Sequence, residues 1–212
     1  MKKLAISISL VLGLVGHANA NDAALVGDAE AGKAKSATCV ACHGVDGNST
    51  IPANPKIAGQ HEEYIFQQLK AFKLGMTSGG KEGRNNPIMG GMVAALSEQD
   101  MKDLSAYYAG QKMSQGMTPE SVVAEGKKLY NQGDAERGIP SCSACHGPRG
   151  TGMKLAGFPR ISYQHAEYIK VSLEQFRDGT RNNDMNGMMR DIASKLTDKD
   201  IETISKYLGG LH

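Results

Sequence analysis

The chain contains the stretch "CVACHGVDG" at residues 39–47 and the stretch "CSACHGPRG" at residues 142–150. Together they hold all four cysteines of the 212-residue sequence. Two cysteines three positions apart lie on one helical turn, so both sulfurs can add to the vinyl groups of a haem, while the histidine that follows is directed at the iron. The pattern predicts two covalent haems. The expected thioether residues are Cys39, Cys42, Cys142 and Cys145, and the expected axial histidines are His43 and His146.

Three other uses of paired cysteines compete with this interpretation. Disulfides are the ordinary use of four cysteines in an exported protein, but they do not explain a histidine after each pair. A zinc ribbon has its two pairs about 15–20 residues apart, whereas these pairs are separated by about a hundred. A thioredoxin-like dithiol needs a βαβ pattern, and none surrounds either pair. Covalent haem attachment is therefore favoured.

The first twenty residues, "MKKLAISISLVLGLVGHANA", have the features of a secretory signal peptide. They combine two lysines, an apolar run and a small-x-small ending. Cleavage is expected after Ala20, which would place the mature chain in the periplasm. The apolar run from Leu4 to about Val15 is too short to span a bilayer, which takes about 20 apolar residues, and no later segment approaches that length.

Charge argues against two classes of partner. The chain has 24 basic and 22 acidic residues, and removal of Lys2 and Lys3 with the signal peptide leaves 22 of each. A neutral mature chain gives no support for binding to nucleic acid or to a membrane surface through a polybasic patch. We expect no nucleic-acid partner, no small-molecule substrate, and either a monomer or a weakly membrane-associated protein.

The second half of the sequence repeats the first. "PKIAGQHEEYI" at 55–65 matches "PRISYQHAEYI" at 159–169 without a gap, and Arg-Asn-Asn recurs at 84–86 and 181–183. "LSEQD" is likewise answered by "LTDKD" near the end of each copy. The chain is therefore interpreted as a tandem duplication of one module.

Domain boundaries are expected in the polar stretch "QKMSQGMTPES". We place the N-terminal domain at 21–113, the linker at 114–117 and the C-terminal domain at 118–212. The second copy alone inserts "NQGDAERGIPS" before its first cysteine. We interpret this insertion as a surface loop without a specific function.

The secondary-structure signals within each module are helical. In "LSEQD" and "LTDKD" a hydroxyl residue stands three positions before an aspartate, which resembles a capping box, and apolar residues follow at helical spacing. Helices are also expected over 62–73 and 166–177, each ending at the next glycine, Gly75 or Gly179. The Gly/Asn-rich stretches between these helices are expected to be loops. The predicted fold class is all-α, with two tandem domains.

The repeat also points to a sixth ligand for each iron. When the two terminal helices are aligned, Met89 and Met189 both fall eight residues before the capping residue, within the Gly/Asn-rich loop. No other methionine pairs in this way. In the second copy, a one-residue shift of the loop would present Met188 instead, and Met185 is a more distant substitute.

Two further repeated positions concern the coordination of the iron. His61 and His165 are the alternative axial ligands, but each stands at the start of an amphipathic helix, where a polar residue needs no special explanation. Pro55 and Pro159 also repeat. Metal-bound histidines usually donate their other ring N–H to a nearby carbonyl, so we expect the two prolyl carbonyls to accept from the axial histidines.

These features together resemble the cytochrome c4 family, which has two class I c-type cytochrome modules in tandem. Each module here has CxxCHG, Pro-Lys/Arg-Ile-x-x-Gln, a late methionine and Leu-Ser/Thr-x-x-Asp, and the resemblance covers essentially the whole mature chain. It implies two domains related by a pseudo-twofold axis, with the haem propionate edges near each other. It implies one haem on Cys39, Cys42, His43 and Met89, and another on Cys142, Cys145, His146 and Met189.

The resemblance further implies a periplasmic carrier of electrons between membrane-bound respiratory complexes, from a quinol-oxidising donor to a terminal oxidase. Two other functions remain open. A dihaem enzyme, such as a peroxidase or thiosulfate dehydrogenase, would need an open position on one iron. A haem subunit of a complex such as sulfide dehydrogenase would be similar in sequence. Because the linker is short, we predict a packed domain interface and electron transfer between unlike haems.

Overall fold

The computed structural model describes residues 25–212, so the expected signal peptide lies outside the described residues. Within that range the regular structure is helical apart from two isolated β-bridges, Asp134–Ile139 and Met153–Phe158. The all-α class is therefore confirmed. No helix between residues 25 and 212 is both long and apolar enough to cross a bilayer.

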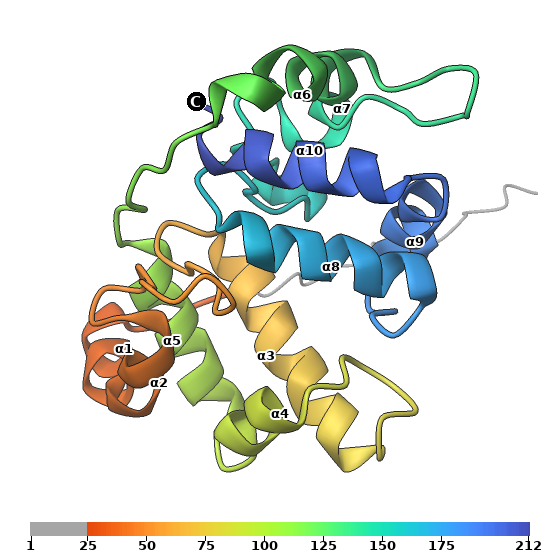
Figure 1. Cartoon of the computed structure of the whole chain (residues 1–212). Helices are drawn as coiled ribbons and strands as arrows, with labels where there is room; N and C mark the ends of the chain where they lie inside the picture. The colour runs from red at the N-terminus through yellow and green to blue at the C-terminus, as the bar shows by residue number, and fades with distance from the viewer. Residues whose placement is uncertain (1–24) are drawn as a thin grey trace, which may run out of the picture.

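Each half of the chain contributes one set of helices. The first half holds α1 (Ala29–Lys35), α2 (Ala37–His43), α3 (Glu62–Thr77), α4 (Pro87–Val93) and α5 (Glu98–Ala109). The second holds α6 (Glu120–Gln132), α7 (Ser143–His146), η1 (Lys154–Ala156), α8 (Ala166–Asp178), η2 (Met185–Gly187), α9 (Met188–Ala193) and α10 (Asp198–Gly209). In both halves the last long helix packs against the first and third α-helices, α5 on α1 and α3, and α10 on α6 and α8. The same packing in both halves confirms two tandem domains of one fold (Figure 1).

The predicted starts of the terminal helices are present as complete capping boxes. Ser97 Oγ accepts from the backbone N–H of Asp100 at 3.1 Å, and Asp100 Oδ2 accepts from the backbone N–H of Ser97 at 2.9 Å. Thr197 and Asp200 make the same reciprocal pair, at 3.1 and 2.8 Å. These bonds satisfy N–H groups that have no partner inside the helix.

One of the two predicted helix ends is wrong. α8 does end before Gly179, which adopts a left-handed conformation with φ of 80°. α3, however, continues past Gly75 to Thr77. Gly75 is buried inside this helix, where a Cβ would lie 2.3 Å from the carbonyl oxygen of Arg84. The glycine is there to allow the returning chain to approach closely, so it does not act as a cap.

The Gly/Asn-rich stretches are not loops throughout. The segment 78–86 is irregular, but α4 follows it and contains Met89, and the corresponding methionine of the second domain, Met189, lies in α9. Asn86 begins α4 by accepting from the backbone N–H of Met89 at 2.9 Å. A short helix, which glycine content alone conceals, therefore carries each candidate ligand, and in the first domain that helix is capped by Asn86.

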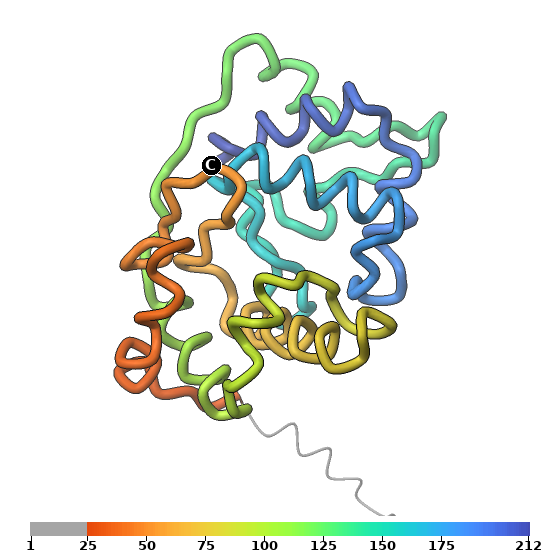
Figure 2. Tube along the Cα trace, turned by 60° about the horizontal axis from the view of Figure 1, so that its bottom comes forward, coloured from red at the N-terminus to blue at the C-terminus, as the bar shows by residue number. Residues whose placement is uncertain are grey.

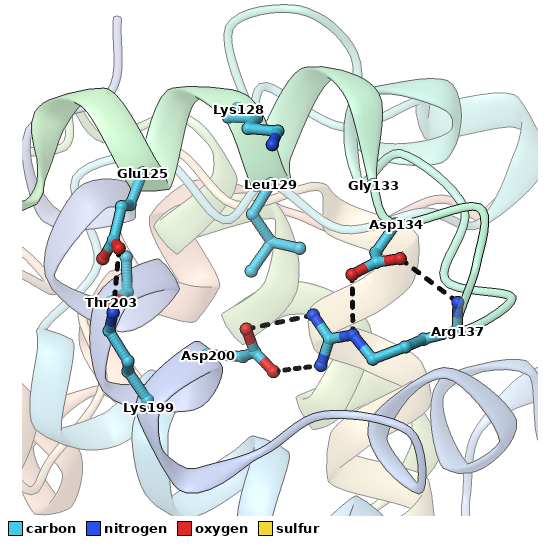
Figure 3. A pocket seen from close by; sticks show the side chains of 9 residues that line it. All are labelled: Glu125, Lys128, Leu129, Gly133, Asp134, Arg137, Lys199, Asp200 and Thr203. Carbon is cyan, nitrogen blue, oxygen red and sulfur yellow. Dashed lines mark hydrogen bonds and ion pairs between the residues drawn. The ribbon is translucent and has the colours of Figure 1, made fainter.

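The insertion before Cys142 holds the start of the last helix in place. Arg137 Nη1 lies 2.6 Å from Asp200 Oδ2, and Arg137 Nε lies 2.7 Å from Asp134 Oδ2 (Figure 3). Ile139 is buried in the core of the C-terminal domain. Beyond Gln132 the insertion is a loop, as expected, and its ion pairs also tie the end of α6 to the N-terminus of α10.

The chain between the domains is fixed at both ends. Ser114 donates its backbone N–H to Asn48 Oδ1 at 2.7 Å, and Thr118 Oγ1 donates to the carbonyl of Tyr207 at 2.7 Å. In two views the green segment that joins α5 to α6 passes along one side of the paired domains (Figure 1, Figure 2). The short linker therefore runs from the first domain to the last helix of the second.

Candidate haem sites

The two CxxCH motifs lie on short helices at the surface of each domain core. Cys39, Cys42 and His43 belong to α2, while Cys142 precedes α7 and Cys145 is within it. All four cysteines are free of disulfides. Between residues 25 and 212 no three His, Cys, Asp or Glu side chains gather as a metal site, so the four thiols do not form the zinc site considered above.

In the second motif, burial also separates Cys142 from the thiols of a redox dithiol. Burial raises the pKa of the Cys142 thiol to about 11. A redox-active CxxC pair needs the opposite, a lowered pKa that supplies thiolate at neutral pH. Two unpaired thiols on one turn beside a histidine fit the chemistry of a covalently attached haem.

Both motif histidines have the same environment. His43 Nδ1 lies 2.9 Å from the carbonyl oxygen of Pro55, and His146 Nδ1 lies 2.9 Å from that of Pro159. Each histidine is 8% exposed. Burial lowers the pKa of both imidazoles, although the prolyl hydrogen bonds oppose this shift. A neutral ring that donates through Nδ1 keeps Nε2 as a lone-pair donor, which is the form that binds a metal.

The methionines differ more between the domains than the histidines do. Met89 is half-buried on the first turn of α4, and the Asn86 cap fixes its backbone. Met189 is half-buried too, but it follows a kink in which Asn186 has φ of 53° and Gly187 has φ of 70°. Met188 opens α9 and is also half-buried, while Met185 is 50% exposed. Exposure therefore sets Met185 apart from the other two methionines.

The predicted packed interface between the domains is present, but sequence reasoning did not identify the residues that form it. Gln164 accepts from the backbone N–H of Lys56 at 2.8 Å and donates to the Lys56 carbonyl at 2.7 Å. Gln60 makes the same pair of bonds with Arg160, at 2.9 and 2.8 Å. Because residue i of one domain bonds residue j of the other and the reverse, the contact has the form of a twofold interface. The ungapped match of 55–65 with 159–169 is the signal that could have revealed it.

His61 and His165 take part in the same interface. His165 Nε2 lies 2.8 Å from the carbonyl oxygen of Ser49, in the loop that follows the first CxxCH motif. His61 points at the equivalent loop of the other domain, where a Cβ on Gly152 would lie 2.7 Å from its Nε2. These are contacts between domains, so the interpretation as polar first-turn residues without a special role is wrong.

A cluster of arginines and tyrosines continues the interface along α3 and α8. Arg84 donates to the hydroxyl of Tyr168 at 3.3 Å, and Arg181 donates to the hydroxyl of Tyr64 at 2.9 Å. Burial alone would raise the pKa of Tyr168, but the two nearby guanidinium groups outweigh it and lower that pKa to about 7. The centre of the interface therefore has a strongly positive potential.

Comparison with known proteins agrees with this geometry. The family described as Cytochrome c matches twice, over residues 29–111 and 123–212. The chain is 46% identical to cytochrome c4 of Stutzerimonas stutzeri over 100% of both sequences. A crystal structure of reduced recombinant cytochrome c4 from Pseudomonas stutzeri superposes with a TM-score of 0.86 at 46% identity, covering 88% of this chain and 100% of that one.

A more distant relative carries a different name. The thiosulfate dehydrogenase electron acceptor of Thiomonas intermedia (strain K12) is 35% identical over 82% of this chain and 78% of that protein. The full-length match to cytochrome c4 proteins, the two Cytochrome c domains and the twofold interface agree with one another. The chain belongs to the cytochrome c4 family of dihaem electron carriers.

Proposed function

We propose that this cytochrome accepts single electrons in the periplasm from a quinol-oxidising donor and delivers them to a membrane-bound terminal oxidase. The haem iron supplies the chemistry, a one-electron change between the ferric and ferrous states. The protein's part is to bind, bury and orient the two groups and to set their potentials. The neutral charge expected for the mature chain favours docking without strong electrostatic steering.

Four protein residues per domain are proposed to hold each haem. Cys39 and Cys42, with the corresponding cysteines of the second domain, provide the thioether bonds. His43 and His146 provide one axial ligand each, held by the hydrogen bonds to Pro55 and Pro159. Met89 and Met189 provide the other. A thioether ligand stabilises the ferrous state, so both potentials are expected to be positive.

One observation above all supports electron exchange between the domains. The residue after each of these prolines, Lys56 or Arg160, makes the paired hydrogen bonds to the glutamine of the other domain. Each candidate axial histidine is therefore connected to the interface through one hydrogen bond to a proline and the residue that follows that proline. Such a rigid connection favours a fixed distance between the two haems and hence a steady rate of electron transfer between them.

A second candidate acceptor role follows from the relative in Thiomonas intermedia, which is named a thiosulfate dehydrogenase electron acceptor. In that role the protein would receive electrons from an enzyme of sulfur oxidation in place of a quinol-oxidising complex. The same two-haem relay would serve both donors, because the donor needs only a docking surface and a suitable potential.

A spectroelectrochemical titration of the mature protein tests the proposal. It should resolve two one-electron steps at positive potentials, and the mass under denaturing conditions should equal the chain from Asn21 plus two haems. Stopped-flow mixing of the reduced protein with oxidase-containing membranes should oxidise both haems. A mass with one haem, or haem that acid and butanone extract, would refute covalent attachment at both motifs.

A control separates the two donors. Reduction of the oxidised protein is followed with quinol-oxidising membranes and, separately, with thiosulfate plus a thiosulfate dehydrogenase. Faster reduction in the second experiment would assign the protein to sulfur oxidation and contradict the respiratory donor.

A further inference from the structure

Two arginines lie buried at the domain interface. Arg84 is 8% exposed and Arg181 is 5% exposed. Each guanidinium stacks on a phenyl ring of its own domain, Arg84 at 4.7 Å from the centre of Phe72 and Arg181 at 4.4 Å from that of Phe176. The two environments are equivalent under the pseudo-twofold relation.

No hydrogen-bond partner of these arginines in the described chain is a carboxylate, and Tyr168 is a phenol whose pKa the two guanidinium groups lower. Arg84 donates to Gln68 Oε1 at 3.0 Å and to the Tyr168 hydroxyl. Arg181 donates to the Tyr64 hydroxyl, to Gln68 Oε1 at 3.3 Å and to an asparagine oxygen. None of the ion pairs between residues 25 and 212 includes either arginine.

A buried guanidinium without an anion is costly, because taking a charge out of water must be compensated by a counter-charge. The nearby Lys56 shows the contrast. It is also buried without a carboxylate, and burial lowers its pKa in the direction of the neutral amine. Arginine stays charged at any physiological pH. Even a fully ionised Tyr168 balances only one of the two guanidinium charges, so the interface needs an acidic group from outside the polypeptide.

The haem itself brings such groups, and this step rests on the proposed function. A haem carries two propionates on the edge opposite the vinyl groups that bond to cysteine. Cys42 is exposed, whereas the arginines lie inside the interface. Arg84 stands five residues before Met89 in the segment that leads into α4, and Arg181 stands eight residues before Met189. Each arginine is thus in the segment that places the proposed second axial ligand of its own domain.

We infer that Arg84 and Arg181 are positioning residues that each bind a propionate of the haem in their own domain. Gln68 Oε1 accepts from both guanidinium groups and so joins the two sites. Its counterpart in the second domain is Ser172, whose buried Oγ has no partner in the described chain. The joined network makes each haem sensitive to the charge that compensates the other.

The test measures both potentials in four variants of the full-length holoprotein. Arg84→Gln removes a positive charge from the first site and should shift the reduction equilibrium of haem 1 at least tenfold toward the ferric state, about 59 mV for one electron. Arg181→Gln should do the same at haem 2. Each change should move the other haem less. Arg84→Lys and Arg181→Lys keep the charge and should recover most of the shift.

Two controls separate charge from structure. Tyr64→Phe removes a cross-domain hydrogen bond but leaves both guanidinium groups, so both potentials should stay within about twofold in equilibrium constant, or ~18 mV. Tyr168→Phe serves only in the Raman comparison, because it also removes an ionisable phenol. Arg177→Gln makes the same substitution on α8, at an arginine that is paired with Asp198. It should also leave both potentials within that limit.

A second measurement keeps the inference testable if an Arg→Gln variant fails to fold. Resonance Raman spectra of the Lys variants should show a shifted propionate bending mode at the haem of the altered domain, and the Tyr→Phe variants should not. Unchanged modes in the Lys variants, or Gln variants with both potentials within twofold of the unaltered protein, would overturn the inference.

Titration with phosphate at constant ionic strength tests whether a free anion, in place of a propionate, binds the two arginines. The potentials should not respond, and a saturable response lost in Arg84→Gln would show a diffusible anion in place of the propionate. The denaturing mass of every variant gives its haem count. A failure of covalent attachment, which would refute the proposed function, is therefore distinct from a failure of this inference.

Discussion

The two domains fill the space between their first and last helices with different side chains. In the N-terminal domain, Tyr108 of α5 is buried beside small Ser36 at the end of α1. In the C-terminal domain the large side chain comes from the other helix, since Tyr130 of α6 is buried in the same core cluster as Leu208 of α10. The large aromatic residue therefore lies on the last helix in the N-terminal domain and on the first helix in the C-terminal domain. In both domains side chains fill the space between the first and last helices, as dense protein cores require. The residues that fill this space differ between the domains.

The ion pairs at the starts of the terminal helices also use different residues in the two domains. Lys35, at the end of α1, reaches the capping aspartate Asp100 at 2.6 Å. In the second domain Arg137 reaches Asp200 at 2.6 Å, and it comes from the insertion, which has no counterpart in the first domain. The same capping carboxylate is paired in both domains, but the basic partner comes from a different part of the chain.

The largest expected effect concerns the candidate methionine ligands. Met89→Ala and Met189→Ala should each halve the near-infrared sulfur-to-iron band of the oxidised protein. Each should also lower the potential of its own domain by on the order of 0.1 V, because axial ligands set haem potentials over ~0.8 V. Met92→Ala, at a methionine that is 43% exposed, is the matched control and should leave the band intact. A Met189→Ala protein with a full band would move the ligand to Met188 or Met185.

Replacing either interface glutamine should have the next largest effect, and the loss of stability should be equal for the two domains. Gln60→Ala or Gln164→Ala leaves a backbone N–H and a carbonyl of the other domain without partners. At about 1–3 kcal/mol for each of the two unpaired groups, each variant should lose roughly 2–6 kcal/mol of unfolding free energy. Denaturant unfolding of the holoprotein measures it, with exposed Gln67→Ala as the control. A loss at one glutamine alone would break the twofold equivalence.

Acid sensitivity is expected at the capping aspartate of the C-terminal domain. Burial raises the pKa of Asp200, but hydrogen bonds from Arg137 and Thr197 outweigh it and lower the pKa to about 2. A lowered folded-state pKa contributes stability above the ordinary value near 3.8, and that stability is lost as the pH falls toward 2. Asp200→Asn should therefore flatten this part of the stability profile and cost about 1 kcal/mol or less at pH 7, given solvent screening.

Thermal unfolding between pH 2 and 7 measures that change, and Asp198→Asn is the control. Asp198 stands on the same turn and its side chain is 89% exposed, so its loss should leave the slope unchanged. An Asp200→Asn profile as steep as that of the unaltered protein would contradict the assignment.

The last comparison concerns one backbone position in each domain. Gly59 has φ of 62°, and its counterpart Tyr163 keeps φ of 61° despite its side chain. Gly59→Ala should cost about 1–2 kcal/mol, because left-handed backbone is strained for an L residue and its Cβ would lie 2.9 Å from the Gln111 carbonyl. Tyr163→Gly should change stability by less than about 1 kcal/mol, since relief of strain is offset by lost contacts with Arg160 and His212.

Calorimetry of the two variants tests this comparison. Equal losses at the two positions would mean that the ring of Tyr163 contributes more than its backbone strain costs. The expected order is a clear loss at Gly59 and a near-neutral result at Tyr163.

The sequence by itself determined the features that depend on neighbours along the chain. Two CxxCH motifs gave the candidate haem attachment, hydroxyl-to-aspartate spacing gave both capping boxes, and the repeat gave two domains of one fold. These are short-range patterns, because thioether attachment and helix capping each need only residues within one turn. Glycine content misled the prediction at Gly75, where a distant carbonyl decides the residue.

Only the tertiary structure decided which residues face the other domain. The partners in the interface are far apart in sequence: Gln60 pairs with Arg160, and Arg84 with Tyr168. The repeated Gln and Arg were visible as identities between the copies, but an identity does not say whether a side chain faces its own core or a second domain. Once the chain has folded, buried polar groups must find partners wherever the packing brings them. That requirement assigned Gln60, Gln164 and the two arginines to the interface.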